Sequence, residues 1–170
     1  MITKTKEYIH VRIGEIKFGE IDSILNATLG SCVGIAIVDK VNKKCGLAHC
    51  FLPEGSMKSP PDQPGKYVVD AIPYLFSKMK LMGRPKKEFD VYVAGGSNMM
   101  AQLKQKNVDH IGHLNKKKVL EILDEMRIPV KEMLNGDSFA CKIFVDCDTL
   151  KVKMIRIKGA PSGSTRTRSK

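Results

Sequence analysis

The sequence predicts a single domain of the α+β class, in which strands and helices build one core. The chain has 170 residues, and a domain of about 150 residues buries roughly 70% of the surface of its unfolded chain, so cross-links are not needed. Several short runs are rich in β-branched residues or alternate apolar with polar side chains, which indicates strands. Two longer runs repeat apolar residues at helical spacing.

The first third of the chain is predicted to consist of strands. Residues 8–13 alternate apolar and polar side chains, which is typical of a half-buried strand, and residues 24–29 form the next β-prone run. Residues 33–38 and 47–51 are also β-prone, and the polar residues 39–44 between them supply a turn. We therefore expect an antiparallel hairpin over residues 33–51.

A loop and a helix are predicted next. Residues 54–65 are rich in Pro, Ser, Gly and Asp, and this loop is either a lid or substrate contact, or a plain surface connection. Residues 67–82 carry apolar side chains at helical spacing. Pro73 interrupts this pattern, which implies a kink or a helix whose first turn begins near Ile72.

The second half of the chain combines strands with helices. The predicted elements are a strand over 89–94, a tight turn over 95–98, a short helix over 99–105, a helix that starts at the N-cap Asn115 and stops at Pro129, and strands over 141–145 and 151–157. Residues 160–170 are basic and contain almost nothing apolar, so we expect a disordered tail after a domain over 1–159.

Charge and cysteine usage narrow the class of protein. The formal net charge is +11, but the basic residues are scattered, and neither an aromatic platform nor zinc-finger spacing is visible, which disfavours nucleic-acid binding. An acidic protein partner, or a merely solvated surface, fits better. Five cysteines without CxxC spacing or a secretion signal predict reduced thiols in the cytoplasm, and no apolar run approaches the roughly 20 residues of a membrane span.

A cysteine and a histidine at the ends of the predicted hairpin are the candidate catalytic pair. Cys32 follows Gly30 and Ser31 just before one strand, and His49 lies in the other, so the hairpin returns His49 to the level of Cys32. A nearby imidazole commonly lowers the pKa of a thiol and shuttles its proton. A metal site formed by Cys45, His49 and Cys50 lacks a fourth ligand.

These residues also carry a resemblance to a known family. The blocks are Thr-Leu-Gly-Ser-Cys-Val at 28–33, Ala-His-Cys-Phe-Leu-Pro at 48–53, Asp-Ala-Ile at 70–72, Gly-Gly-Ser-Asn-Met at 95–99, and Ile-Gly at 111–112 with Asn115. Together they resemble the chemoreceptor glutamine deamidases called CheD. The resemblance implies an α/β sandwich of mixed or antiparallel sheets with flanking helices, similar to the cysteine deamidases of bacterial toxins.

The resemblance also implies the chemistry and the partners. It assigns Cys32 as nucleophile, His49 as base and Thr28 as a third catalytic residue, with no cofactor and no metal. The substrates would be glutamines on the cytoplasmic helices of chemoreceptors, and a CheC-type phosphatase would be the regulator. We further expect the oxyanion to be bound by the N–H of Cys32 and one from Gly30 or Ser31, because glycine permits close backbone approach.

Three other functions remain open at this point. A CheD-like domain could act as a non-enzymatic adaptor that binds receptors or the phosphatase. The same pair of residues could also serve a cysteine peptidase or a transglutaminase, which would cleave peptides or incorporate amines.

Overall fold

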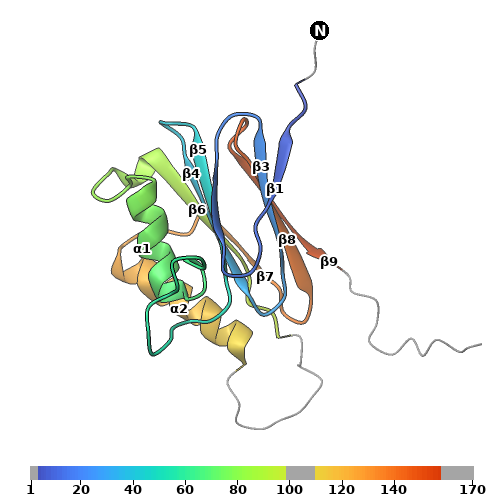
Figure 1. Cartoon of the computed structure of the whole chain (residues 1–170), viewed down its shortest axis with the longest axis vertical. Helices are drawn as coiled ribbons and strands as arrows, with labels where there is room; N and C mark the ends of the chain where they lie inside the picture. The colour runs from blue at the N-terminus through green and yellow to red at the C-terminus, as the bar shows by residue number, and fades with distance from the viewer. Residues whose placement is uncertain (1–3, 99–109, 158–170) are drawn as a thin grey trace, which may run out of the picture.

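The structure, a computed structural model, describes residues 4–98 and 110–157. Two mixed sheets pack face to face, and two helices cover the outer face of the larger sheet (Figure 1). One apolar cluster fills the space between the sheets, and a second lies between the larger sheet and the helices. The α+β class and the packing of helices on sheets confirm the predicted fold class, whereas the likeness to toxin deamidases stays a prediction.

The two sheets divide the strands as follows. The four-stranded sheet has the order β1-β3-β8-β9, with β1 (Glu7–His10), β3 (Ser23–Leu29), β8 (Ala140–Asp146) and β9 (Lys151–Ile157). The five-stranded sheet has the order β2-β5-β4-β6-β7, with β2 (Ile16–Gly19), β5 (Lys44–Cys50), β4 (Val33–Asp39), β6 (Phe89–Gly95) and β7 (Glu132–Asn135). Among the strand pairs of the described residues, β1–β3 and β6–β7 are parallel and the others are antiparallel.

The predicted hairpin forms the centre of the five-stranded sheet. Strands β4 and β5 are antiparallel, and their last pairs before the loop ends are Gly34 with His49 and Val33 with Cys50. Every residue of β4 is buried, because successive side chains enter the two different cores. Val33 faces the helices, while Ala36 faces the other sheet. The end of this hairpin that carries Cys32 and His49 therefore lies inside the molecule.

The two helices pack side by side on the sheet. Helix α1 (Val68–Lys78) contains Pro73 inside it, so the helix begins earlier than Ile72 and continues past the proline. Helix α2 (Ile111–Glu125) has His110 as its N-cap, so the predicted N-cap Asn115 is wrong. Asn115 is a residue within the helix, and it is fully buried. A short 3₁₀ helix, η1 (Lys86–Glu88), precedes β6.

The structure differs from the elements expected from the sequence at a few other places. The first strand ends at His10 rather than Ile13, because the chain turns there to contact β5, and strands β2 and β7 were not predicted. The turn at 95–98 follows β6 as expected, with Gly95 at a φ of +96°. The predicted helix over 99–105 and the tail over 160–170 lie outside the described residues.

Candidate active site

Cys32 lies in a short loop that crosses from one sheet to the other. Strand β3 ends at Leu29 in the four-stranded sheet, and β4 begins at Val33 in the five-stranded sheet. The loop of Gly30, Ser31 and Cys32, called here the nucleophile loop, makes this crossing. The Cys32 side chain is 6% exposed and packs in the cluster between the sheets. The candidate nucleophile is therefore held at the edge of a core, with little contact with solvent.

Each carbonyl of the nucleophile loop accepts a hydrogen bond from the protein. The Ser97 N–H donates to Gly30 at 3.0 Å, the Gly96 N–H donates to Cys32 at 2.9 Å, and the Asn115 side-chain amide donates to Ser31 at 3.0 Å. The turn after β6 fits closely here, since a Cβ on Gly95 would collide with the Cys32 carbonyl oxygen. The backbone around Cys32 is thus fixed from three sides.

Two N–H groups of the same loop have no acceptor on another described residue. Within residues 4–98 and 110–157, the N–H groups of Ser31 and Cys32 donate to no other residue. Ser31 is half-buried, and glycine precedes it. Buried or half-buried backbone donors are normally paired. Two free donors beside a cysteine have the chemistry that an oxyanion site requires.

His49 lies on the face of β5 that looks toward Cys32. Its alternate neighbours along β5, Cys45 and Leu47, belong to the cluster between the sheets, which also contains Cys32. His49 pairs with Gly34, two residues from Cys32. Diagonal neighbours of this kind across an antiparallel pair are within reach of long side chains. The predicted meeting of Cys32 and His49 at one end of the hairpin is thereby supported by the register.

The imidazole of His49 is oriented by a backbone carbonyl. Its Nδ1 lies 2.9 Å from the oxygen of Val11, and a carbonyl only accepts, so Nδ1 carries the proton. Its Nε2 is buried and has no partner among the described residues. The neutral imidazole therefore presents Nε2 as an unoccupied base.

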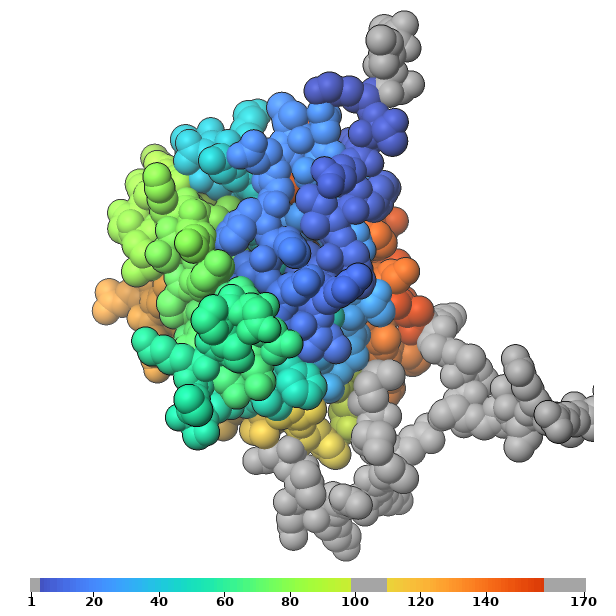
Figure 2. Space-filling view, in the orientation of Figure 1, coloured from blue at the N-terminus to red at the C-terminus, as the bar shows by residue number. Residues whose placement is uncertain are grey.

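The backbone of His49 is held by the segment that follows Val11. The Gly14 N–H donates to the His49 carbonyl at 2.8 Å, and the His49 N–H donates to Glu15 at 3.0 Å. Gly65 closes this contact from the other side, because its N–H donates to Gly14 at 2.8 Å and a Cβ there would lie 2.8 Å from the Glu15 oxygen. Figure 2 shows the segment after β5 against the N-terminal segment.

Burial keeps both members of the pair neutral in the free protein. Loss of solvent raises the pKa of the Cys32 thiol to about 11. The same cause lowers the pKa of His49 below its ordinary value, although the Val11 carbonyl acts in the opposite direction. These directions oppose the expectation that the imidazole holds Cys32 as a thiolate, and the alkylation experiment below decides between the two. A buried thiol beside a neutral base calls for proton transfer during attack.

Thr28 is not brought to this pair. It lies on β3 between Ala27 and Leu29, which are buried between the sheets, so the Thr28 side chain points to the outer face of the sheet and is exposed. The imidazole nitrogen that a third catalytic residue would orient, Nδ1 of His49, is instead held by the carbonyl of Val11.

Replacing Thr28 with alanine should leave turnover within about threefold of the wild-type value, since exposed side chains away from a site have small effects. The measurement is the rate of product formation on the substrate proposed below, with thermal unfolding recorded in parallel. A loss of 100-fold or more, on the scale of about 10²–10⁴ that a general base contributes, would restore Thr28 to the catalytic group.

Two residues that hold the site were not assigned this role from the sequence. Val11 acts through its main chain, so its side chain carries no signal. Asn115 belongs to the blocks of the resemblance, yet its position after a polar stretch suggested a helix N-cap. The signal that was available is a polar residue at helical spacing from Val119 and Leu123, on the apolar face of α2.

Cys45, His49 and Cys50, the alternative weighed as a metal site, do not share one side of their strand. Cys45 faces the other sheet, whereas Cys50 faces the helices, so the two thiols lie on opposite sides of β5. Among the residues that the structure describes, no group of three metal-binding side chains converges. No helix in the described ranges is long and apolar enough to span a membrane.

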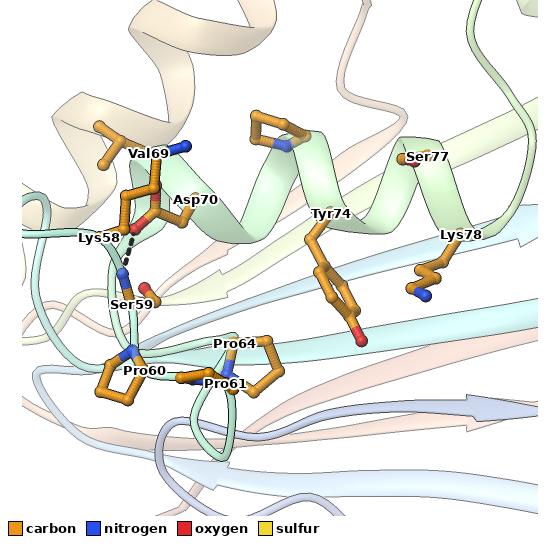
Figure 3. Close-up of a pocket in the computed structure, with 11 residues that line it drawn as sticks. Lys58, Ser59, Pro60, Pro61, Pro64, Val69, Asp70, Tyr74, Ser77 and Lys78 are labelled. Carbon is orange, nitrogen blue, oxygen red and sulfur yellow. Dashed lines mark hydrogen bonds between the residues drawn. The ribbon is translucent and has the colours of Figure 1, made fainter.

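One surface hollow lies beside α1, and neither Cys32 nor His49 lines it. It has a volume of about 640 Å³ and lies between α1 and the loop that precedes it (Figure 3). Pro60, Pro61 and Tyr74 line it, and the Asp70 carboxylate accepts the Ser59 N–H at 2.7 Å. Asp70 thus anchors the loop rather than entering the site. The loop over 54–65 packs on α1.

The comparisons with known proteins agree with the blocks in the sequence. The model of the family "CheD chemotactic sensory transduction" matches residues 51–156. The match begins after Cys32 and His49, so it does not bear on the pair itself. A Clostridium botulinum (strain Hall) protein named "Probable chemoreceptor glutamine deamidase CheD" is 36% identical over 146 residues, which is 85% of this chain and 90% of that protein.

Two further proteins are similar. A Clostridium novyi (strain NT) protein with the same name is 36% identical over 122 residues, covering 71% of this chain and 75% of that protein. The crystal structure of the Bacillus licheniformis hypothetical protein YfiH is similar at a TM-score of 0.38 and 9% identity, over 71% of this chain and 49% of that one, which carries no argument. From the family match and the relatives at 36% identity, the chain belongs to the CheD family.

Proposed function

We propose that this protein is a chemoreceptor glutamine deamidase that converts side-chain carboxamides to carboxylates with release of ammonia, using Cys32 as nucleophile and His49 as base. The relatives named above carry this activity in their names. The observation that carries the proposal is the unoccupied Nε2 of His49, whose Nδ1 is fixed by Val11 on the face of β5 that looks toward Cys32.

The first half of the reaction forms a thioester. The Cys32 sulfur attacks the carbonyl carbon of the glutamine side chain while Nε2 of His49 accepts the thiol proton. Negative charge develops on the carbonyl oxygen, and the free N–H groups of Ser31 and Cys32 are the donors available to bind it. The proton on Nε2 then passes to the departing nitrogen. Ammonia leaves and a γ-glutamyl thioester on Cys32 remains.

The second half hydrolyses the thioester. Neutral Nε2 accepts a proton from water as the water oxygen attacks the thioester carbon, and the same N–H groups bind the oxyanion again. The carbon–sulfur bond breaks, the sulfur recovers its proton from His49, and glutamate is the product. The residues present are sufficient for both halves, and the proposal requires no cofactor.

The pKa directions predict how Cys32 reacts with a small alkylating agent. At pH 7 a thiol with a pKa of about 11 is about 10⁻⁴ thiolate. The alkylation rate of Cys32 by iodoacetamide should therefore rise by about tenfold per pH unit from pH 7 to pH 9. Peptide mass spectrometry assigns the label to Cys32 rather than to the other cysteines. A rate that levels off near neutral pH would instead show a thiolate held by imidazolium.

The deamidation itself is tested on a chemoreceptor cytoplasmic fragment incubated with this protein. A gain of about 1 Da at individual glutamines, with an equal amount of free ammonia, is the expected result of amide hydrolysis. Peptide cleavage would point to a peptidase, and incorporation of an added amine would point to a transglutaminase. Binding of the fragment without any change in mass would establish an adaptor and contradict the proposal.

The same proposal places the protein with its substrate in the cytoplasm. All five cysteines are unpaired, which agrees with a reducing compartment. A CheC-type phosphatase is the proposed regulator, and it rests on the sequence resemblance. Adding such a phosphatase to the deamidation assay should change the rate if the two proteins interact on the enzyme surface that receptors use.

A further inference from the structure

Asn115 joins the two chain segments that carry the catalytic pair. Its side-chain Nδ2 donates to the carbonyl of Ser31 at 3.0 Å and to the carbonyl of Phe51 at 3.0 Å. Ser31 directly precedes Cys32, and Phe51 follows His49 by two residues. Asn115 is fully buried in α2 and reaches both carbonyls from the helix side of the sheet.

These two bonds stand where the ladder between β4 and β5 stops. The last pair of the ladder is Val33 with Cys50, so Cys32 and Phe51 would form the next one. Instead, the two strands are connected beyond this point through one side-chain amide. The N–H groups of His49 and Phe51 donate away from β4, to Glu15 and Lys66, so a pair of Cys32 with Phe51 would carry no backbone hydrogen bonds. The Asn115 amide supplies the connection that the ladder lacks at this level.

The amide orientation is determined by its surroundings. Both partners are carbonyl oxygens, which only accept, so the nitrogen and not the oxygen must face them. Asn115 Oδ1 is buried and has no partner in the described ranges. Unpaired buried acceptors are uncommon. The residue is thus arranged for its two donor bonds and leaves its own oxygen unsatisfied.

The same turn of α2 supports the nucleophile loop by a second route. A Cβ on Gly112 would collide with the carbonyl oxygen of Ser97, so the helix lies directly against the turn after β6. That turn donates the Ser97 and Gly96 N–H groups to the carbonyls of Gly30 and Cys32. The first turns of α2 therefore pack against the turn after β6, which binds the Gly30 and Cys32 carbonyls, and also carry Asn115, which binds the Ser31 carbonyl.

We infer that Asn115 is a positioning residue for deamidation: by holding the carbonyls of Ser31 and Phe51, it sets the separation of Cys32 from His49. This inference rests on the proposed function. Asn115 lies on the helix side of the sheet while the two reacting side chains face the other sheet, so it acts through the backbone. Its loss should lower kcat and leave KM for the receptor unchanged.

The test uses two variants at this position and one control. Asn115→Leu keeps the branched shape at Cγ and removes both donors without adding a charge, and the smaller Asn115→Ala serves if leucine does not fold. Val119→Ala is the control, because Val119 is equally buried, lies one turn further along the same face of α2, and contacts neither carbonyl. Thermal unfolding of all three gives the stability loss that each variant carries.

In the Asn115 variants, kcat for receptor deamidation should fall by about 10-fold to 100-fold with KM within about twofold, because small displacements in a catalytic group have effects of this size. Val119→Ala should keep kcat within about threefold at a comparable loss of stability. The inference is overturned if a folded Asn115 variant keeps wild-type kcat, or if Val119→Ala loses as much.

A second readout separates this inference from the proposed function. The rate of Cys32 alkylation by iodoacetamide does not depend on which substrate the protein uses. It should change by more than about fivefold in the Asn115 variants and remain unchanged in Val119→Ala, since only the former alter the loop around the thiol. If the wild-type protein deamidates nothing, the proposed function fails, while this comparison still decides whether Asn115 positions Cys32.

Discussion

Replacing Cys32 with alanine is expected to reduce deamidation by roughly 10⁴-fold or more, because no thioester can form without the nucleophilic sulfur. The sulfur forms the bond to the substrate carbon in the proposed mechanism, and no other described side chain near Nε2 of His49 replaces it. The measurement is the mass gain of receptor glutamines over time. The variant should still bind the receptor fragment, since the rest of the surface is unchanged.

Cys50→Ala is the matched control for this variant. Cys50 is also a buried thiol at the same end of the hairpin, but it faces the helices rather than the other sheet. Both substitutions remove one sulfur from a core, so their effects on thermal unfolding should be similar. Only the Cys32 variant should lose activity. Equal loss in both would mean that packing, and not nucleophilic attack, explains the requirement for Cys32.

Replacing His49 with glutamine is expected to lower kcat by about 10²-fold to 10⁴-fold, the usual contribution of a general base. Glutamine can still donate to the Val11 carbonyl, so the strand and the loop keep their contact, but it cannot accept a proton from the thiol. The pH dependence adds a second criterion. Because burial and not an ion pair sets the pKa of Cys32, alkylation of this thiol above pH 9 should be unchanged in the variant.

His10→Gln is the control for the histidine. His10 is exposed at the end of β1, where its ring contacts the Asn26 side chain at 3.2 Å, and it lies close enough to contribute to the lowered pKa of His49. Its loss should leave kcat within about threefold. A variant of His49 that keeps full activity, or of His10 that loses it, would contradict the assignment of Nε2 of His49 as the base.

Local patterns in the sequence were sufficient for most elements of this fold. The hairpin of β4 and β5, the strand β6 and the strands β8 and β9 follow from runs of β-branched residues between polar turns. Strands β2 and β7 were missed because each is a short run at a sheet edge, with few buried residues to create a pattern. Pro73 predicts a kink or a helix that begins near Ile72, but packing of α1 on the sheet overrides the second of these local preferences, since α1 begins at Val68.

Local sequence was enough to single out the residues of the candidate site: a cysteine after Gly-Ser and a histidine at the return of a hairpin, in blocks that resemble one family. What surrounds them became visible in the folded protein alone. Val11 orients the imidazole, Asn115 holds the two strand ends, and Thr28 faces away. The physical reason is that backbone carbonyls carry no sequence signature, and the two sheets bring distant segments of the chain together.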